Sequence, residues 1–241
     1  MTPPIFRVAF LISLISFALV DSHKDSHDHA HDHSHEHTHG NDDASTDTIK
    51  LHRIANDPVL EDTKTLETLL WRRDTDGNRV RRDGVDLDYR HPRTLQTPLM
   101  ASCLGGKAKI LAALLEAGAD PSIPEKDGYH APHGAAFQGR PEAMKVLIDA
   151  GIDVRHRHED GYEPLHRACW GGKEGHSETV SLLIAPPSSG GGGVPWDVPA
   201  ANGKTCEAMT RNSETLQALR LAKKAAAKGK ATAHPDVKKE L

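Results

Sequence analysis

The chain has 241 residues, a length that fits one domain with flanking tails. Aromatic residues make up only 4% of it, which favours helices packed through small residues over a large β-rich core. A formal net charge of −4 argues against a general affinity for nucleic acid.

The N-terminus resembles a secretory signal peptide. Arg7 supplies the positive region, and residues 8–20 form an uncharged apolar run. Val20-Asp21-Ser22 offers a cleavage site before His23, and Ser16-Phe17-Ala18 offers another. The run is shorter than the roughly 20 apolar residues that span a bilayer. We therefore predict that residues 1–22 are removed as a signal peptide, and an uncleaved membrane anchor is the alternative.

Histidine alternates with small or acidic residues after this point. The alternating residues are His27, His29, His31, His33, His35, His37 and His39. Imidazole is a good ligand for zinc, copper and nickel, so this segment is predicted to bind such metals at several exchangeable sites, although the chain requires no cofactor. Residues 23–47 cannot bury a core and are predicted to be disordered without metal. A mere spacer, or a polyelectrolyte that gains positive charge below about pH 6.5, is the alternative.

A period of 33 residues begins near residue 97. The phrases that start at Thr97, His130 and Glu163 follow one another at this step (130 − 97 and 163 − 130). Residues 114–120 read Leu-Leu-Glu-Ala-Gly-Ala-Asp, and residues 147–153, at the same step of 33, read Leu-Ile-Asp-Ala-Gly-Ile-Asp. A fixed period of this length indicates a solenoid of stacked units, because one unit cannot bury its apolar face alone.

The repeated phrase resembles the ankyrin repeat, and residues 160–172 are its best copy. Thr97 can cap a helix that starts at Pro98. Gly118 and Gly151 suit the left-handed residue that ends a second helix. The resemblance implies an all-α fold, an ankyrin-repeat solenoid of helix–turn–helix pairs with β-turn tips, flanked by disordered tails.

Weaker copies extend the resemblance over residues 48–222, as four to five repeats of which the first and last are degenerate. Terminal repeats are expected to be atypical because one face meets water. Residues 74–78 resemble the start of a calcium-binding loop, but Arg79 stands where such a loop needs glycine, so an inserted polar turn is predicted. Residues 186–195 are predicted to form a flexible loop before the last repeat.

The resemblance also implies a concave binding face on the first helices and the turn tips. The positions that supply it recur at steps of 33 and are Leu104, Phe137 and Trp170 on the helices, and Tyr129 and Tyr162 at the tips. Tyrosine and tryptophan are favoured interface anchors. With Arg157 and other cations of the turns, they predict a partly apolar, basic groove suited to a peptide or an acidic loop. In the alternative interpretation, Leu104 and Phe137 pack between repeats and Trp170 shields the loop.

Three cysteines cannot all pair within the chain. Cys103 and Cys169 occupy one repeat position two units apart, which places them about 20 Å apart if stacked helices are ~8–10 Å apart. This exceeds the ~7 Å limit between the Cα atoms of a disulfide. Both are therefore predicted to be small packing residues.

Residues 223–241 are predicted to be a basic, disordered tail. The tail ends in Lys238-Lys239-Glu240-Leu241, which resembles the Lys-Asp-Glu-Leu retrieval signal. Together with the signal peptide, this ending predicts residence in the lumen of the endoplasmic reticulum. The same residues resemble a cytosolic dilysine signal, which would require the membrane-anchored form, and secretion is a further alternative.

No serine or cysteine stands in a recognisable nucleophile context. His133 and His166 occupy a position of the ankyrin repeat whose side chain usually forms hydrogen bonds within the turn and the helix start. We therefore predict that the protein is not an enzyme. The sequence predicts a monomeric adaptor of the secretory pathway that binds another protein through the concave face. The histidine-rich segment would be a metal-binding or pH-responsive arm. Neither a nucleic-acid partner nor stable membrane insertion after cleavage is expected. A luminal metal-binding protein and a membrane-anchored adaptor are the alternatives.

Overall fold

The structure is a computed structural model that describes residues 45–57, 62–172 and 174–232. The predicted signal peptide, the seven alternating histidines and the retrieval signal lie outside these residues.

The helices of the described chain follow one another in pairs. The first four pairs are α2 (Thr46–Asn56) with α3 (Thr63–Leu70), α4 (Pro98–Gly105) with α5 (Ala108–Glu116), α6 (Ala131–Gln138) with α7 (Pro141–Asp149), and α8 (Pro164–Trp170) with α9 (Glu174–Ile184). The last pair is the short α10 (Cys206–Met209) and the long α11 (Ser213–Thr232).

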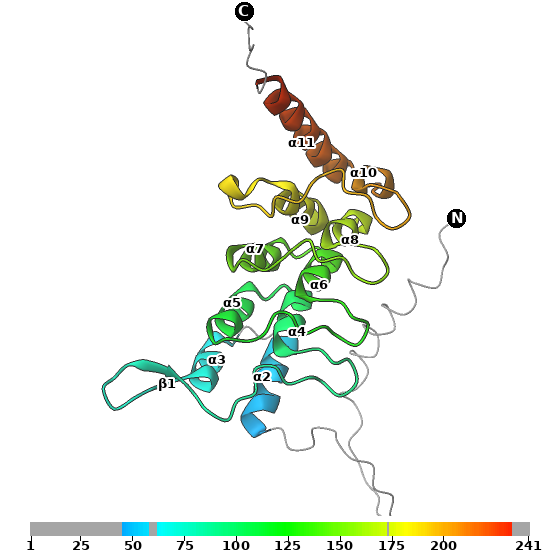
Figure 1. Ribbon diagram of the computed structural model, residues 1–241. Helices are drawn as coiled ribbons and strands as arrows, with labels where there is room; N and C mark the ends of the chain where they lie inside the picture. The colour runs from blue at the N-terminus through cyan, green and yellow to red at the C-terminus, as the bar shows by residue number, and fades with distance from the viewer. Residues whose placement is uncertain (1–44, 58–61, 173, 233–241) are drawn as a thin grey trace, which may run out of the picture. The chain divides into compact units, whose positions relative to one another are not determined.

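The pairs stack in two rows. Each of α2, α4, α6 and α8 contacts the next helix of an inner row that ends at α10, and α3, α5, α7, α9 and α11 form an outer row in the same way. Figure 1 shows the rows as two columns. The core lies between them, where Leu111, Met144, Leu147 and Leu165 are completely buried. Neighbouring units thus bury a continuous core, which confirms the predicted stacked-repeat fold.

The local signals for helix ends act as predicted. The hydroxyl of Thr97 accepts a hydrogen bond of 3.2 Å from the backbone N–H of Met100, and Pro98 is the first residue of α4. Gly118 and Gly151 have φ angles of +93° and +73°, which few residues other than glycine adopt without strain.

Tight turns lie at the tips of the loops that join the pairs. The backbone N–H groups of Glu125 and His158 donate to the carbonyls of Tyr129 and Tyr162, both at 3.0 Å. Adjacent tips are also tied together, for example by the bond from the N–H of Lys126 to the carbonyl of Thr94. These bonds confirm the predicted turn tips and fix the spacing between them.

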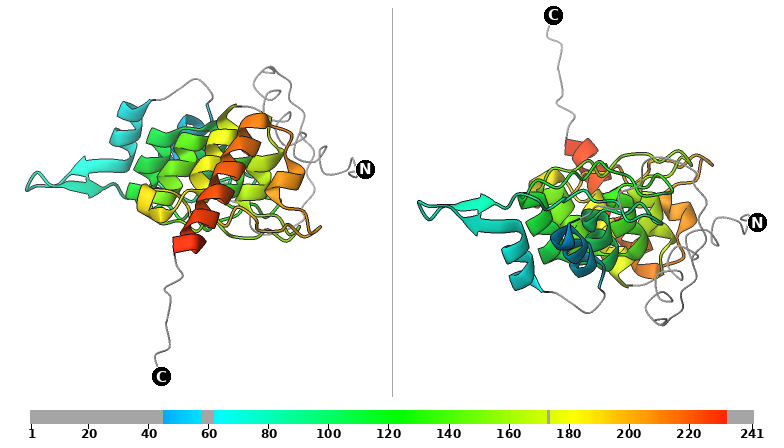
Figure 2. Two further views of the ribbon diagram at one scale, coloured as in Figure 1. Left: turned by 90° about the horizontal axis from the view of Figure 1, so that it is seen from above. Right: turned by 90° about the horizontal axis from the view of Figure 1, so that it is seen from below.

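The polar insertion of the first pair is a β-hairpin. Strands β1 (Trp71–Arg73) and β2 (Arg79–Arg81) are antiparallel, with Trp71 opposite Arg81. The hairpin projects from the side of the stack (Figures 1 and 2). The carboxylate of Asp74 accepts bonds of 3.0 and 2.8 Å from the N–H groups of Asp76 and Asn78, so it closes the tip. No group of three or more His, Cys, Asp or Glu within the described residues could hold a metal ion.

Residues 186–195 form a cap on the end of α9 and not a flexible loop. The N–H groups of Gly192, Gly193 and Val194 donate to carbonyls at the end of α9, at 2.8 or 2.9 Å, and η1 (Pro187–Ser189) lies in the same segment. A Cβ atom on Gly191 would lie 2.3 Å from the carbonyl oxygen of Ala185. The glycine run thus allows two backbone segments to approach closely, a role that composition alone did not distinguish from flexibility.

Helix α11 continues past residue 222, the predicted end of the repeat domain. Residues 223–232 are helical, so the prediction of a disordered tail was wrong for this stretch. Thr215 and Leu219 are buried where α11 packs on α9, and the alanines and lysines that follow are strong helix formers. Within the part of the chain that the structure covers, no helix combines the length and apolar character needed to cross a membrane.

Cys169 forms a disulfide with Cys206 that joins α8 to α10, with a distance of 5.5 Å between the Cα atoms. The prediction that Cys169 is a free packing residue is therefore wrong. It rested on the distance to Cys103, which is indeed free and buried. Cys206 lies in the adjacent pair, where neighbouring inner helices are close enough to be bridged.

Candidate partner-binding face

Three aromatic side chains from two successive pairs surround Arg167. Tyr129 and Tyr162 come from the turns before α6 and α8, and Trp170 lies one helical turn after Arg167 on α8, which places both on one face of the helix. The guanidinium carbon of Arg167 is 4.8 Å from the ring centroid of Tyr129, 5.1 Å from that of Tyr162 and 5.0 Å from that of Trp170. These distances suit cation–π attraction. We call these four residues the arginine cage.

Hydrogen bonds fix the buried side of the cage. Arg167 donates to the hydroxyl of Tyr129 at 2.8 Å and also to the carboxylate of Asp160, and the Tyr129 hydroxyl donates to Asp160 at 3.0 Å. Burial would raise the pKa of Asp160, but the contact with His158 and the charge of Arg167 lower it below its ordinary value. Burial raises the pKa of Tyr129. At neutral pH, a charged carboxylate therefore holds a charged guanidinium and a neutral phenol in place.

The solvent side of the cage is aromatic. Tyr129 and Arg167 are buried, whereas 43% of Trp170 is exposed. The ring centroid of Tyr162 lies 4.6 Å from that of Trp170. The side-chain amide of Asn202 donates a hydrogen bond of 3.2 Å to the hydroxyl of Tyr162. The exposed indole of Trp170 thus contacts Arg167 on its own helix and Tyr162 at the turn tip. A partner that covers it would bury a large ring whose position is already fixed.

The structure does not bring the two other predicted helix residues into the cage. Leu104 is half-buried and packs towards the next inner helix, where a Cβ on Gly134 would lie 3.1 Å from its side chain. Phe137 is also half-buried, and its carbonyl lies 3.0 Å from Nε2 of His176. Leu104 therefore has the inter-repeat position of the alternative interpretation.

Arg157 lies at the rim of the face. Its guanidinium donates to the Glu163 carboxylate at 2.8 Å and to the carbonyl of Pro199 at 3.1 Å. The same turns expose the carboxylates of Asp127 and Glu159. The face therefore carries carboxylates beside the exposed cations from which a basic groove is predicted.

Arg167 and Asp160 hold the aromatic residues together, but they were not among the residues that the sequence predicts for the face. A signal was present, since Arg167 shares its repeat position with Ala101 and Gly134 and is the large cation among them. The contacts of His158 could not be found this way. Its ring stacks on Tyr129 at 3.9 Å between centroids, a contact between residues of different repeats.

His166 and His133 occupy equivalent positions but differ in their contacts. Nδ1 of His166 accepts a bond of 3.1 Å from the N–H of Glu163, and Nε2 lies 3.1 Å from the Val198 carbonyl, as expected for a structural residue. The two ring nitrogens of His133 are buried without a hydrogen-bond partner, so the predicted bonding within the turn is wrong there. Burial, followed by the charge of Arg167, lowers the pKa of His133 to about 3.

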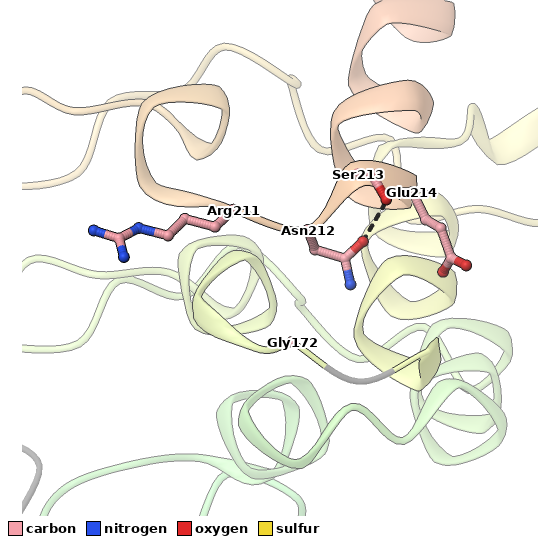
Figure 3. A pocket seen from close by; sticks show the side chains of 5 residues that line it. All are labelled: Gly172, Arg211, Asn212, Ser213 and Glu214. Atoms are coloured by element: carbon pink, nitrogen blue, oxygen red, sulfur yellow. Dashed lines mark hydrogen bonds between the residues drawn. The ribbon is translucent and has the colours of Figure 1, made fainter.

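An open pocket of about 340 Å³ lies at the start of α11, lined by Gly172, Arg211, Asn212, Ser213 and Glu214. Figure 3 shows that the side chains of Arg211 and Glu214 point away from each other. The Glu214 carboxylate already accepts a bond of 2.8 Å from Ser177. These charged groups do not converge on one ligand, so the pocket is a weaker candidate than the face around Trp170.

Comparison with known proteins agrees with the architecture. A family model described as ankyrin repeats, in three copies, matches residues 52–158 and 99–191, which together cover more than half of the chain. The comparison with curated proteins found no match. Ankyrin repeats are protein–protein interaction modules, and proteins built from them are generally non-enzymatic scaffolds. The 33-residue period, the stacked helix pairs and this match show that the chain belongs to the ankyrin-repeat family.

Proposed function

We propose that this protein is an adaptor of the secretory pathway that binds another protein through the surface around Trp170. The observation that carries the proposal is the exposure of 43% of this indole beside a cage whose other members are buried or half-buried. Large aromatic residues that are fixed before binding are the usual anchors of protein interfaces, because they bury much area at a small entropic cost.

The arginine cage gives this anchor its rigidity. Arg167 is paired with Asp160 and bonded to Tyr129, so it is not available as a strong charge for the partner. The partner therefore inserts an apolar or aromatic side chain beside Trp170 and Tyr162. Polar contacts come from the rim, where Arg157, Asp127 and Glu159 are exposed.

The lumen of the endoplasmic reticulum is the compartment that we propose. The disulfide between Cys169 and Cys206 supports it, since such bonds persist in oxidising compartments and are rare in the cytosol. The apolar N-terminal run and the Lys-Lys-Glu-Leu ending support it independently. In this compartment, residues 27–39 would act as an auxiliary arm that binds zinc or a similar metal, or that responds to pH.

Substitution of the anchor tests the interaction. Proteins crosslinked to the full chain in a luminal fraction would be identified, and the affinity of the main one measured for the wild type and for Trp170→Ala. We expect the variant to bind at least about 30-fold more weakly, the loss typical of an interface anchor. Leu221→Ala is the matched control, because Leu221 is also a large, exposed apolar residue, on α11. Equal binding by Trp170→Ala, or an equal loss in the control, would contradict the proposal.

The compartment is tested separately by N-terminal sequencing of the native chain and by deletion of Leu241. We expect a chain that begins near His23, is found in the lumen and is secreted when Leu241 is removed. A native chain that retains its first 20 residues would contradict the luminal placement and favour the anchored adaptor.

A further inference from the structure

The β1–β2 hairpin presents an unusual concentration of arginine. Residues 79–82 read Arg-Val-Arg-Arg, the one place in the sequence where three arginines fall within four residues. The opposite strand adds Arg72 and Arg73. The binding face around Trp170 does not use this hairpin, which belongs to the first pair.

We infer that the peptide bond between Arg82 and Asp83 is a site of endoproteolysis by a serine endoprotease that recognises clustered arginines. Such an enzyme holds each guanidinium with carboxylates, because the planar group forms paired hydrogen bonds with them. The inference rests on the proposed passage through the secretory pathway, where the chain would meet a protease of this class.

The backbone before the bond has the shape that a protease cleft binds. Residues 79–81 are an extended strand, and its single partner in the sheet is β1. Both strands are therefore edges, and the outer edge of β2 can pair with an extended segment of another protein. In such a strand, alternate side chains point to opposite faces, so Arg79 and Arg81 lie on one face, and Arg82 follows directly after the strand.

The chain after the bond is open. Asp83 and Gly84 form a turn, and 96% of the Asp83 side chain is exposed. A Cβ atom added to Gly84 would meet no atom within 4 Å, and the ion pair of Asp83 with Arg72, at 3.8 Å, is exposed. Exposed turns of this kind are preferred sites of nicking.

The contacts that hold the arginines are weak enough to be exchanged. Arg82 donates to the carbonyl of Thr68 at 2.7 Å and lies 3.7 Å from Asp47, while 39% of its side chain is exposed. Arg79 pairs with Glu67 and Glu116 at a similar exposure. Exposed ion pairs contribute little to stability, because solvent screens them. A two-stranded hairpin is itself only marginally stable, so its local opening costs little.

The reaction is simple hydrolysis. Water adds across the amide bond, which gives Arg82 a carboxylate and Asp83 a free amine, with no change of oxidation state. Two hydrogen bonds would still join the two fragments. The N–H of Asp86 donates to the Thr48 hydroxyl at 3.0 Å, and Lys107 donates to the carbonyl of Ile54 at 2.9 Å. Together with the packing of α2 on α4, they would keep the fragments together until denaturation. The cut would remove the covalent link between the histidine-rich segment and the binding face.

The experiment treats the purified, folded full chain with a purified subtilisin-like endoprotease specific for paired basic residues. We expect one new N-terminus, at Asp83, and two fragments that co-elute under native conditions but separate in denaturant. The variant Arg81→Gln/Arg82→Gln should be cut at least about 100-fold more slowly, because the charged subsites of the protease would be left unpaired. Arg72→Gln/Arg73→Gln is the matched control, with the same loss of charge on the same hairpin, and should be cut at an unchanged rate.

Two results would overturn the inference: a folded chain that resists the enzyme while the denatured chain is cut at Asp83, or a first cut at another position. Thermal melting of each variant shows whether the fold is intact. The assay needs neither the partner nor the cell compartment, so its failure is distinguishable from a failure of the proposed function.

Discussion

The third and fourth helix pairs, α6–α7 and α8–α9, are copies of one unit, yet they differ in how their inner helices are held. Gly134 in α6 is equivalent to Arg167 in α8, and Ala136 in α6 is equivalent to Cys169 in α8. In the fourth pair, Arg167 is the centre of the arginine cage and Cys169 forms a disulfide. In the third pair, the residues at the same positions, Gly134 and Ala136, are small and buried. At these two positions, the inner helix of the third pair thus packs through small side chains, whereas that of the fourth makes specific contacts.

The histidines at positions 133 and 166 show the same difference. His166 has contacts on both ring nitrogens, whereas the nitrogens of His133 have none. A buried polar group without a partner costs stability, while a bonded one contributes to it. One repeat motif can therefore stabilise one unit and weaken the next, depending on the loop that packs beside it.

The largest expected effect comes from the disulfide of the fourth pair. We expect the double variant Cys169→Ala/Cys206→Ala to lose about 4 kcal/mol of unfolding free energy, because the bond closes a loop of 37 residues in the unfolded chain. Urea titration with and without a thiol reductant measures this. The control Cys103→Ala keeps the disulfide and should remain sensitive to the reductant. An equal sensitivity of wild type and double variant to reductant would refute the role of the bond.

A smaller effect is expected from His133 as the pH falls. Its pKa of about 3 in the folded chain lies below the value of about 6.5 in the unfolded chain. The unfolded chain therefore takes up the proton first, and stability that is present above pH 6.5 is lost as the pH falls towards 3. Between pH 7.5 and pH 5, His133→Leu should lose about 2 kcal/mol less than the wild type.

At pH 7.5 the same substitution separates the two histidines. His133→Leu removes no hydrogen bond and should change the unfolding free energy little, whereas His166→Leu should cost about 1–3 kcal/mol because it leaves the N–H of Glu163 unpaired. Urea titrations of the wild type and both variants at pH 7.5 and pH 5 measure these differences in unfolding free energy. Similar costs for the two variants would show that the difference in contacts has no energetic consequence.

The smallest effect concerns the helix starts. Thr97 caps α4 through its hydroxyl, whereas His130, at the equivalent position before α6, makes no such bond. We expect His130→Thr to raise the unfolding free energy by about 0.5–1 kcal/mol and Thr97→Ala to lower it by about 1 kcal/mol. Thermal melts suffice to measure both. A loss of stability in His130→Thr would mean that the tilted ring contact of His130 with His156, at 4.1 Å between ring centroids, outweighs the missing cap.

The sequence by itself determined the repeat architecture. Its period of 33 fixed the stacking, and Thr97, Pro98, Gly118 and Gly151 marked helix ends, because capping and left-handed turns depend on residues that are close in the chain. The resemblance to the ankyrin repeat also pointed to Trp170, Tyr129 and Tyr162 as candidate residues of a binding face.

Only the tertiary structure decided what these residues contact. Tyr129 bonds to Asp160 across 31 residues, Arg167 to Tyr129 across 38, and Cys169 to Cys206 across 37. Each contact joins different repeats, and equivalent positions carry different side chains, such as Gly134 and Arg167, so the repeat period does not fix which side chains meet. The same reason separates His166, which faces the Val198 carbonyl, from His133, which faces no such group.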